Sequence, residues 1–361
     1  IYGEVKDLTK AVQMATKRIE GAYAFCIMHN DEPGKIVATK RNAPLLIGVG
    51  EGEYYVASDV PATIKHTNKA IYLTDNQVVT LTPDSLVLED ENENVLEPKI
   101  EVLPWEPVAL SKMGYKHFML KEIHEQPDVI RNILVGKLHT SDSPIVLNEV
   151  KLTKETLKNL NRIQIIACGT SLHAAMIGKY IIEGFCNIPV DVEASSEYIY
   201  RKTVTDSHTL VIGVSQSGET ADTLTAIKQS KARGSHILII TNRPDSAMAR
   251  EADSLVPVSA GIEVSVAATK SYIAQLTSFY LLALYMAEIK GTMSETDLVN
   301  IKSDMLLLPQ KIEQILAHKE DIQKCARKYS GTKDFIYIAR GVNYPTALEG
   351  ALKLKEISYI N

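Results

Sequence analysis

The stretch that decides the fold is TLVIGVSQSGETADTLTA, residues 209–226. Its apolar, β-rich start at 210–214 predicts a buried strand, and the polar loop SQSGET follows at 215–220. A helical pattern then continues through 221–227. A strand that ends at a glycine turn and restarts as a helix leaves several backbone N–H groups facing one small space. These donors and the positive end of the helix dipole favour an anion such as a phosphate.

Neutral hydrogen-bonding side chains dominate this loop. Ser215, Ser217 and Thr220 supply hydroxyl groups, and Gln216 supplies an amide. Such a loop suits a sugar phosphate, because the hydroxyls of the sugar must be recognised as well as its charge. The alternative is a Ser/Gly-rich turn whose hydroxyls only cap the helix, and the spacing alone leaves both interpretations open.

A second copy of the same pattern occurs earlier in the chain. An apolar strand is predicted at 163–167 and a helix at 173–185. Between them lie the polar or small residues Cys168, Gly169, Thr170 and Ser171. Two such units in neighbouring parallel strands would converge on one ligand at the carboxyl ends of the strands. The repeat therefore favours a binding site over a simple capped turn.

Three motifs carry a family resemblance: ACGTS at 167–171, SQSGET at 215–220 and ALEGALKLKEISYI at 347–360. In this order they resemble the sugar isomerase (SIS) domains of the glutamine–fructose-6-phosphate aminotransferases, and the resemblance extends over the whole chain. It implies transfer of the amide nitrogen of glutamine to fructose 6-phosphate and isomerisation of the product to glucosamine 6-phosphate. It also implies a homodimer formed through the SIS domains, and amino transfer without a pyridoxal or other cofactor.

The resemblance and the strand pattern together predict the domain order. Residues 1–105 are expected to be the latter part of an α+β, N-terminal-nucleophile glutaminase domain, followed by a linker at 106–149 that begins just after Trp105. A parallel, flavodoxin-like α/β sandwich, the first SIS domain, is expected at 150–292. Residues 293–361 would hold connecting helices and the start of a second SIS domain, which opens with a strand at 335–339.

The family's glutaminase nucleophile would precede residue 1, and its C-terminal tail would follow residue 361. We therefore expect this stretch by itself to make no glucosamine 6-phosphate. The resemblance places sugar-phosphate contacts at Cys168, Gly169, Thr170, Ser171, Ser215, Gln216, Ser217, Thr220, Val266 and Ala268. At Val266 the contact is made by the backbone, and Ala268 stands where the family often has a serine. The nearby Lys270 is interpreted as an exposed helix lysine rather than a Schiff-base lysine.

The third motif carries the candidate catalytic residues. Glu349, Lys353 and Glu356 are four and then three residues apart, so they share one face of a helix. Spacing alone favours a solvated ladder of charges. The family motif instead places the isomerase base at Glu356, with Lys353 and Glu349 in supporting positions. Moving a proton between C1 and C2 of the sugar suits a partly buried carboxylate with a lysine beside it.

Composition narrows the remaining possibilities. The net charge of −5 and a pI near 6.0 argue against a nucleic-acid or anionic membrane partner. The four cysteines show no CxxC spacing, which predicts neither a metal site nor disulfides and indicates a reducing cytoplasm. No apolar run is expected to approach the roughly 18 residues of a membrane span, and 278–286 is interpreted as a short core helix.

A second class of function stays open, because SIS domains also serve as non-catalytic, sugar-phosphate-binding regulatory modules. Such a sensor would carry a DNA-binding or regulatory partner in its first hundred residues, whereas this chain is strand-rich there. The acid–base residues at 349–356 also favour an enzyme. No GxGxxG loop follows a strand, which argues against a dehydrogenase.

Overall fold

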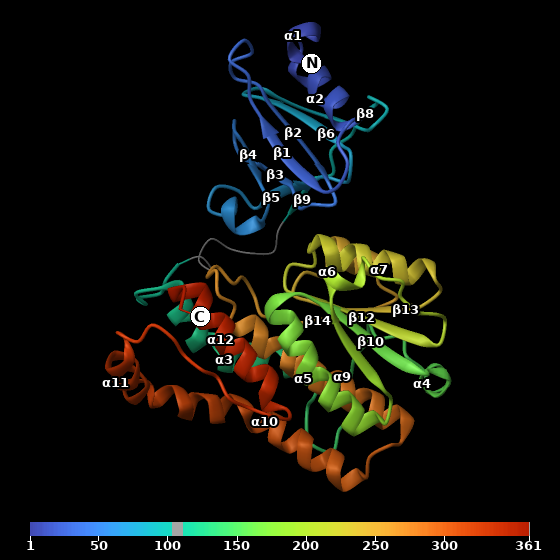
Figure 1. Cartoon of the computed structure of the whole chain (residues 1–361), viewed down its shortest axis with the longest axis vertical. Helices are drawn as coiled ribbons and strands as arrows, with labels where there is room; N and C mark the ends of the chain where they lie inside the picture. Colours follow the sequence, from blue (N-terminus) through green and yellow to red (C-terminus); the bar gives the residue numbers. More distant parts are fainter. Residues whose placement is uncertain (103–110, 361) are drawn as a thin grey trace. The chain divides into compact units, whose positions relative to one another are not determined.

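The computed structural model describes residues 1–102 and 111–360, apart from the side chain of Pro61. The chain divides into two compact units, residues 1–111 and 112–361 (Figure 1). Trp105, which we placed just before the linker, lies outside the described residues.

The first unit contains two antiparallel sheets, as the strand-rich pattern predicts. One sheet has the order β1-β2-β6-β7-β8, made of Tyr23–Ile27, Ile36–Arg41, Val78–Thr82, Ser85–Glu89 and Val95–Leu96. The other has the order β4-β3-β5-β9, made of Tyr54–Ala57, Leu46–Val49, Lys69–Tyr72 and Glu101–Val102. Apolar side chains of both sheets, including Ala38, Ile47 and Val79, form one buried cluster.

Two short helices precede these strands, α1 (Tyr2–Val5) and α2 (Leu8–Thr16). Leu8 and Val12 of α2 pack on Val37 and Val78 of the first sheet. The helix therefore covers the face of that sheet that does not contribute to the cluster between the sheets.

The second unit is organised around a five-stranded parallel sheet of order β11-β10-β12-β13-β14. Its strands are Val190–Ala194, Arg162–Ala167, Thr209–Ser215, His236–Thr241 and Ser254–Pro257. All seven residues of β12, the central strand, are buried, which explains its continuous apolar sequence. The α/β, flavodoxin-like fold predicted from the sequence is confirmed. In this order the strand sequence reverses between β10 and β12, where such sheets bind their ligands.

Helices cover both faces of this sheet. Leu210 and Ile212 of β12 join the larger core, which is shared with α3 (Phe118–Leu134), α5 (Gly169–Cys186), α9 (Lys270–Lys290) and part of α10 (Glu295–Ala317). Val211 points to the opposite core, which is shared with α6 (Ser195–Tyr198), α7 (Ala221–Ala232) and α8 (Ala247–Glu251). The short α4 (Lys154–Asn159) adds Leu157 to the larger core.

Helix α9 corrects one expectation. By length and composition its 21 residues could cross a membrane, so the apolar stretch is longer than the predicted 278–286. However, 67% of the 18 most apolar consecutive residues of α9 are buried inside the protein. There α9 packs along α5. The interpretation of this stretch as a core helix is retained, with wider bounds.

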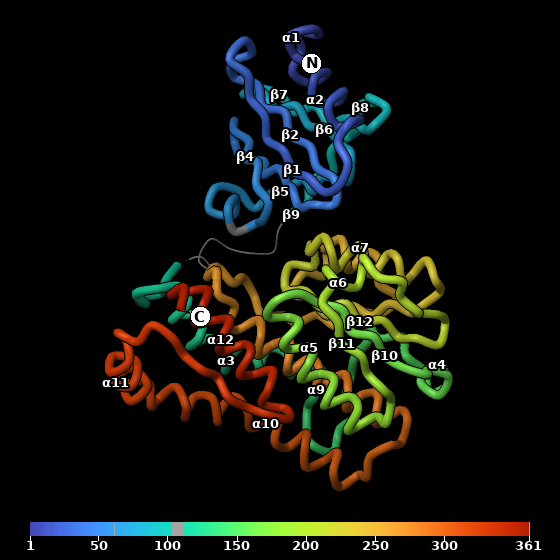
Figure 2. The backbone as a smooth tube through the Cα atoms, viewed as in Figure 1, coloured from blue at the N-terminus to red at the C-terminus, as the bar shows by residue number. Residues whose placement is uncertain are grey.

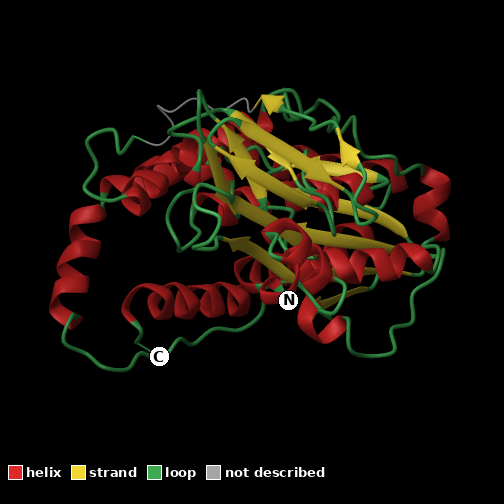
Figure 3. Cartoon of the chain, turned by 90° about the horizontal axis from the view of Figure 1, so that it is seen from above, coloured by secondary structure: helices red, strands yellow, loops and turns green. Residues whose placement is uncertain are grey.

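The chain after α9 departs from prediction at one point. Helices α10, which packs against α3, and α11 (Lys319–Tyr329) lead to α12 (Asn343–Ser358) (Figure 2). The strand predicted at 335–339 is wrong: this segment is a loop, with Ile336 88% and Ile338 89% exposed (Figure 3). A strand requires a hydrogen-bonding neighbour, and none of the described strands pairs with this segment.

Candidate functional site

Two loops flank the point where the strand order reverses. Residues 168–171 follow β10 and open α5, and residues 215–220 follow β12 and lead into α7. In the described structure neither helix has a side chain that caps its first turn. The first backbone N–H groups of both helices are therefore available to an anion, and the helix dipoles favour one there.

The hydroxyl groups of the second loop hold it in shape. Ser215 Oγ accepts a hydrogen bond from the Gly218 N–H (3.0 Å) and lies 2.9 Å from Thr220 Oγ1. Ser217 Oγ accepts from the Glu219 N–H (3.2 Å). Thr220 is the N-cap residue of α7, yet its hydroxyl makes no capping bond there. The simple helix-cap interpretation of this loop therefore does not describe its hydrogen bonds.

Gly218 is required at its position for two reasons. Its φ of +66° is a left-handed backbone conformation that L side chains rarely adopt. A Cβ atom there would also lie 2.0 Å from Ser246 Oγ and 2.9 Å from Thr241 Oγ1. The loop after β12 thus packs directly on the segment after β13.

Asn242 joins three loops at the carboxyl end of the sheet. Its N–H donates to the Gln216 carbonyl (3.2 Å), and its side-chain Nδ2 donates to the Gly261 carbonyl (2.7 Å). Its Oδ1 accepts from the Ala260 N–H (2.7 Å). We did not single out Asn242 from the sequence, although it is a polar residue that directly follows the apolar strand β13.

Residues 263–269 form a mostly half-buried loop that leads into α9. Val266 is 93% exposed, whereas Ala268 is partly buried. Lys270, at the start of α9, is only 5% exposed, and its Nζ lies 2.7 Å from Glu125 Oε2. The prediction of an exposed lysine is wrong because an acidic partner from α3 allows this lysine to be buried.

Helix α12 brings the candidate catalytic residues to the first loop. Thr170 Oγ1 donates to Glu349 Oε1 (2.9 Å), and Lys353 Nζ donates to Thr170 Oγ1 (2.9 Å). Lys353 Nζ also lies 2.6 Å from Glu356 Oε2. Glu349 is only 5% exposed, so the solvated-ladder interpretation does not hold for it.

His173 of α5 completes this cluster, with its Nδ1 2.7 Å from Glu349 Oε2. We did not single out His173 from the sequence. Its only signal was its position two residues after Ser171, in the first turns of the predicted helix. Burial alone would raise the pKa of Glu349, but the His173 hydrogen bond, the Lys353 charge and the Thr170 hydroxyl together lower it.

This pKa shift predicts a pH-dependent contribution to stability. Because the folded-state pKa lies below the usual 4.5, ionised Glu349 stabilises the fold above that pH. The stabilisation is lost as the pH falls through the folded-state pKa. Glu349→Gln should lower the free energy of unfolding at pH 7 by about 1–3 kcal/mol, measured by urea denaturation.

The difference between Glu349→Gln and the unchanged chain should shrink steadily below pH 4.5, the usual value. Glu320→Gln, at an exposed position of α11, is the control and should change stability by less than about 0.5 kcal/mol at either pH. If Glu349→Gln lowered the free energy of unfolding equally at pH 7 and in acid, ionised Glu349 would not be the source of the stabilisation.

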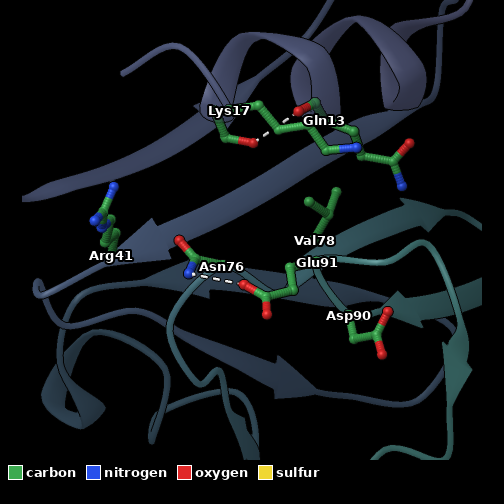
Figure 4. A pocket seen from close by; sticks show the side chains of 8 residues that line it. Gln13, Lys17, Arg41, Asn76, Val78, Asp90 and Glu91 are labelled. Carbon is green, nitrogen blue, oxygen red and sulfur yellow. Dashed lines mark hydrogen bonds between the residues drawn. The ribbon is translucent and has the colours of Figure 1, made fainter. Parts of the chain in front are cut away.

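The first unit contains a different, polar pocket (Figure 4). It has a volume of about 270 Å³ and is lined by both cationic and anionic side chains, among them Lys17, Arg41, Asp90 and Glu91. Several of these charges already have partners within the unit: Lys17 pairs with Glu93 (3.1 Å), and Asp90 accepts from Asn94. No residue of the predicted site lies in this pocket. Among the described residues, no group of three or more His, Cys, Asp or Glu side chains could hold a metal ion.

The chain is similar to known proteins in sequence and in fold. Residues 156–285 match the SIS domain family. The chain is 45% identical over 355 residues to the glutamine–fructose-6-phosphate aminotransferase (isomerizing) of Clostridium perfringens, and 46% identical over 356 residues to that of Gloeobacter violaceus. Each match covers 98% of this chain but only 58% of the relative.

Among solved structures, the chain resembles the C-terminal domain of glucosamine-fructose-6-phosphate aminotransferase from Francisella tularensis. The TM-score is 0.66 at 38% sequence identity, and the match covers 70% of each chain.

Proposed function

Because the chain belongs to the glutamine–fructose-6-phosphate aminotransferase family, we propose that its second unit binds fructose 6-phosphate at the loops 168–171 and 215–220. The whole protein would then use glutamine to convert this sugar into glucosamine 6-phosphate. One observation carries the proposal. Two uncapped helix N-termini meet at the switch point of the sheet, and the Glu349–Lys353 pair touches one of the two loops.

The phosphate would bind at the start of α7, where Ser215, Ser217 and Thr220 supplement the backbone N–H groups. Ser171 is prepared for a sugar contact by Gln275, whose Nε2 donates to Ser171 Oγ (2.9 Å). Because the serine oxygen accepts that bond, its own proton is free for a ligand oxygen. Further contacts are proposed from Gln216, from the main chain at Val266 and Ala268, and from residues 168–170.

Glu356 would act as the isomerase base, taking a proton from C1 of the sugar and returning it to C2. Lys353 lies 2.6 Å from that carboxylate and can stabilise the negative charge that develops on the substrate. Thr170 and Glu349 hold Lys353 in place. The proposed proton transfer from C1 to C2 therefore relies on side chains that already contact one another.

We further propose that the first unit belongs to the part of the protein that hydrolyses glutamine and serves there as scaffold. The whole protein is proposed to be a cytoplasmic homodimer formed through its SIS domains, without a nucleic-acid or membrane partner. The burial of α9 supports its interpretation as the core helix of a soluble protein.

Thr220→Ala tests the proposed phosphate site. Losing a hydroxyl that bonds a charged group should weaken fructose 6-phosphate binding by about 1.5–3 kcal/mol, measured by isothermal titration calorimetry. Thr153→Ala removes the capping hydroxyl of α4 and is the control, expected to leave the affinity unchanged. Equal affinities for Thr220→Ala and the unchanged chain would remove Thr220 from the site.

A further inference from the structure

We propose that Glu122 of α3 is a positioning residue for the sugar site, because it holds the loop 263–269 in its binding shape. This inference rests on the proposed function and adds a residue from outside the SIS family match at 156–285. Helix α3 lies in the segment predicted to be a linker, yet it belongs to the second unit and contributes side chains to its larger core.

Among the described residues, the hydrogen bonds of the Glu122 carboxylate are made to one end of the loop. Glu122 Oε1 accepts hydrogen bonds from the Val264 N–H (2.6 Å) and the Ser265 N–H (3.3 Å). Glu122 Oε2 accepts from the same Ser265 N–H (3.3 Å) and from the Ser265 hydroxyl. The residue is only 2% exposed. A buried carboxylate is costly unless it is well hydrogen-bonded, and here one short loop supplies the donors.

The other end of the loop is held by a second carboxylate. Glu263 Oε1 accepts from the Thr269 N–H (2.7 Å), at the residue that precedes α9. The start of α9 is itself tied to α3 through the Lys270–Glu125 ion pair. The loop is therefore fixed at both ends, while Val266 between them is 93% exposed.

This arrangement suits a loop that offers its main chain to a ligand. A loop fixed before binding loses little conformational freedom when the ligand arrives, so the affinity is higher than for a mobile loop. Without Glu122, the N–H groups of Val264 and Ser265 would lose their acceptor. The main chain around Val266 would then sample several conformations.

Two possible roles of Glu122, electrostatic repulsion of the sugar phosphate and positioning of the loop, predict opposite effects of its removal on binding. If Glu122 acted on the sugar phosphate only through its negative charge, removing the charge would strengthen the binding of an anion. If it positions the loop, the same change weakens binding. Glu122→Gln removes the charge while keeping the size and one acceptor oxygen, so it separates the two cases.

The experiment compares Glu122→Gln and Glu122→Ala with Glu288→Gln. Glu288 is a matched control: it accepts a backbone N–H, that of Ile145 (3.0 Å), and pairs with the buried Lys302. It lies near the opposite end of α9, about 27 Å from Lys270 at 1.5 Å per residue. Fructose 6-phosphate affinity is measured by calorimetry, and hydrogen exchange of the loop amides by mass spectrometry.

We expect Glu122→Ala to weaken sugar-phosphate binding about tenfold or more, and Glu122→Gln less. Amides 264 and 265 should exchange faster in both variants, whereas Glu288→Gln should match the unchanged chain in affinity and in loop exchange. Unchanged or tighter binding in both Glu122 variants would overturn the inference, and so would unchanged loop protection. If the unchanged chain bound no fructose 6-phosphate, the proposed function would fail, while loop exchange would still decide whether Glu122 holds the loop.

Discussion

Glu356→Gln, in a chain that spans the full length of the relatives, is expected to lower the isomerisation rate by about 10²- to 10⁴-fold, the effect of a lost general base. The substitution keeps the size of the side chain and removes its basicity. Of the three charged residues on this helix face, Glu356 has the most exposed side chain. Its Oε2 lies 2.6 Å from Lys353 Nζ. Rates of glucosamine 6-phosphate formation and of glutamine hydrolysis, measured side by side, check the prediction.

Sugar binding and glutamine hydrolysis should survive in this variant, because Glu356 contacts neither 168–171 nor 215–220 directly in the described hydrogen bonds and ion pairs. Glu320→Gln on α11 is the control and should isomerise normally. An isomerisation rate near that of the unchanged protein would place Glu356 among the solvated charges and the proton carrier elsewhere.

Gly218→Ala is expected to destabilise the second unit and to abolish measurable sugar-phosphate binding. The left-handed φ of +66° alone costs an alanine about 1–3 kcal/mol. The new Cβ would also meet Ser246 Oγ at 2.0 Å. That hydroxyl cannot move freely, because it caps α8 through the Ala249 N–H (3.3 Å). Urea denaturation and calorimetric titration with fructose 6-phosphate measure the two effects.

Gly234→Ala is a matched control for the backbone strain. Gly234 also has a left-handed φ, +88°, but a Cβ there would meet nothing within 4 Å. Gly218→Ala should therefore be less stable than Gly234→Ala by about 1–3 kcal/mol, the usual effect of overpacking. Similar losses in the two variants would show that the loop can move away from Ser246.

Much of the second unit could be predicted from local sequence. The buried strand at 210–214 and the polar loop after it are both local patterns. The repeat of this pattern at 163–171 was enough to expect two neighbouring parallel strands, which pair as β10 and β12. Such predictions succeed because a few consecutive residues are enough to indicate a buried strand or a glycine turn.

The strand predicted at 335–339 shows where local patterns fail. Its residues have the composition of a strand, but the structure leaves Ile336 and Ile338 exposed in a loop. Strand formation depends on hydrogen bonds to another segment, and a local pattern carries no information about whether that segment is present. The prediction therefore failed because none of the described strands pairs with this segment, and not because its residues disfavour a strand.

The sequence by itself determined the parallel α/β fold of the second unit and the two loops of the candidate site, together with the helix face that carries Glu349, Lys353 and Glu356. Only the tertiary structure decided that Glu349 is buried against His173, that Lys270 is paired with Glu125, and that Glu122 accepts a hydrogen bond from the Val264 N–H. These contacts join residues 176, 145 and 142 positions apart. The environment of a charged side chain depends on partners that only folding brings together, so its burial cannot be inferred from its neighbours in the chain.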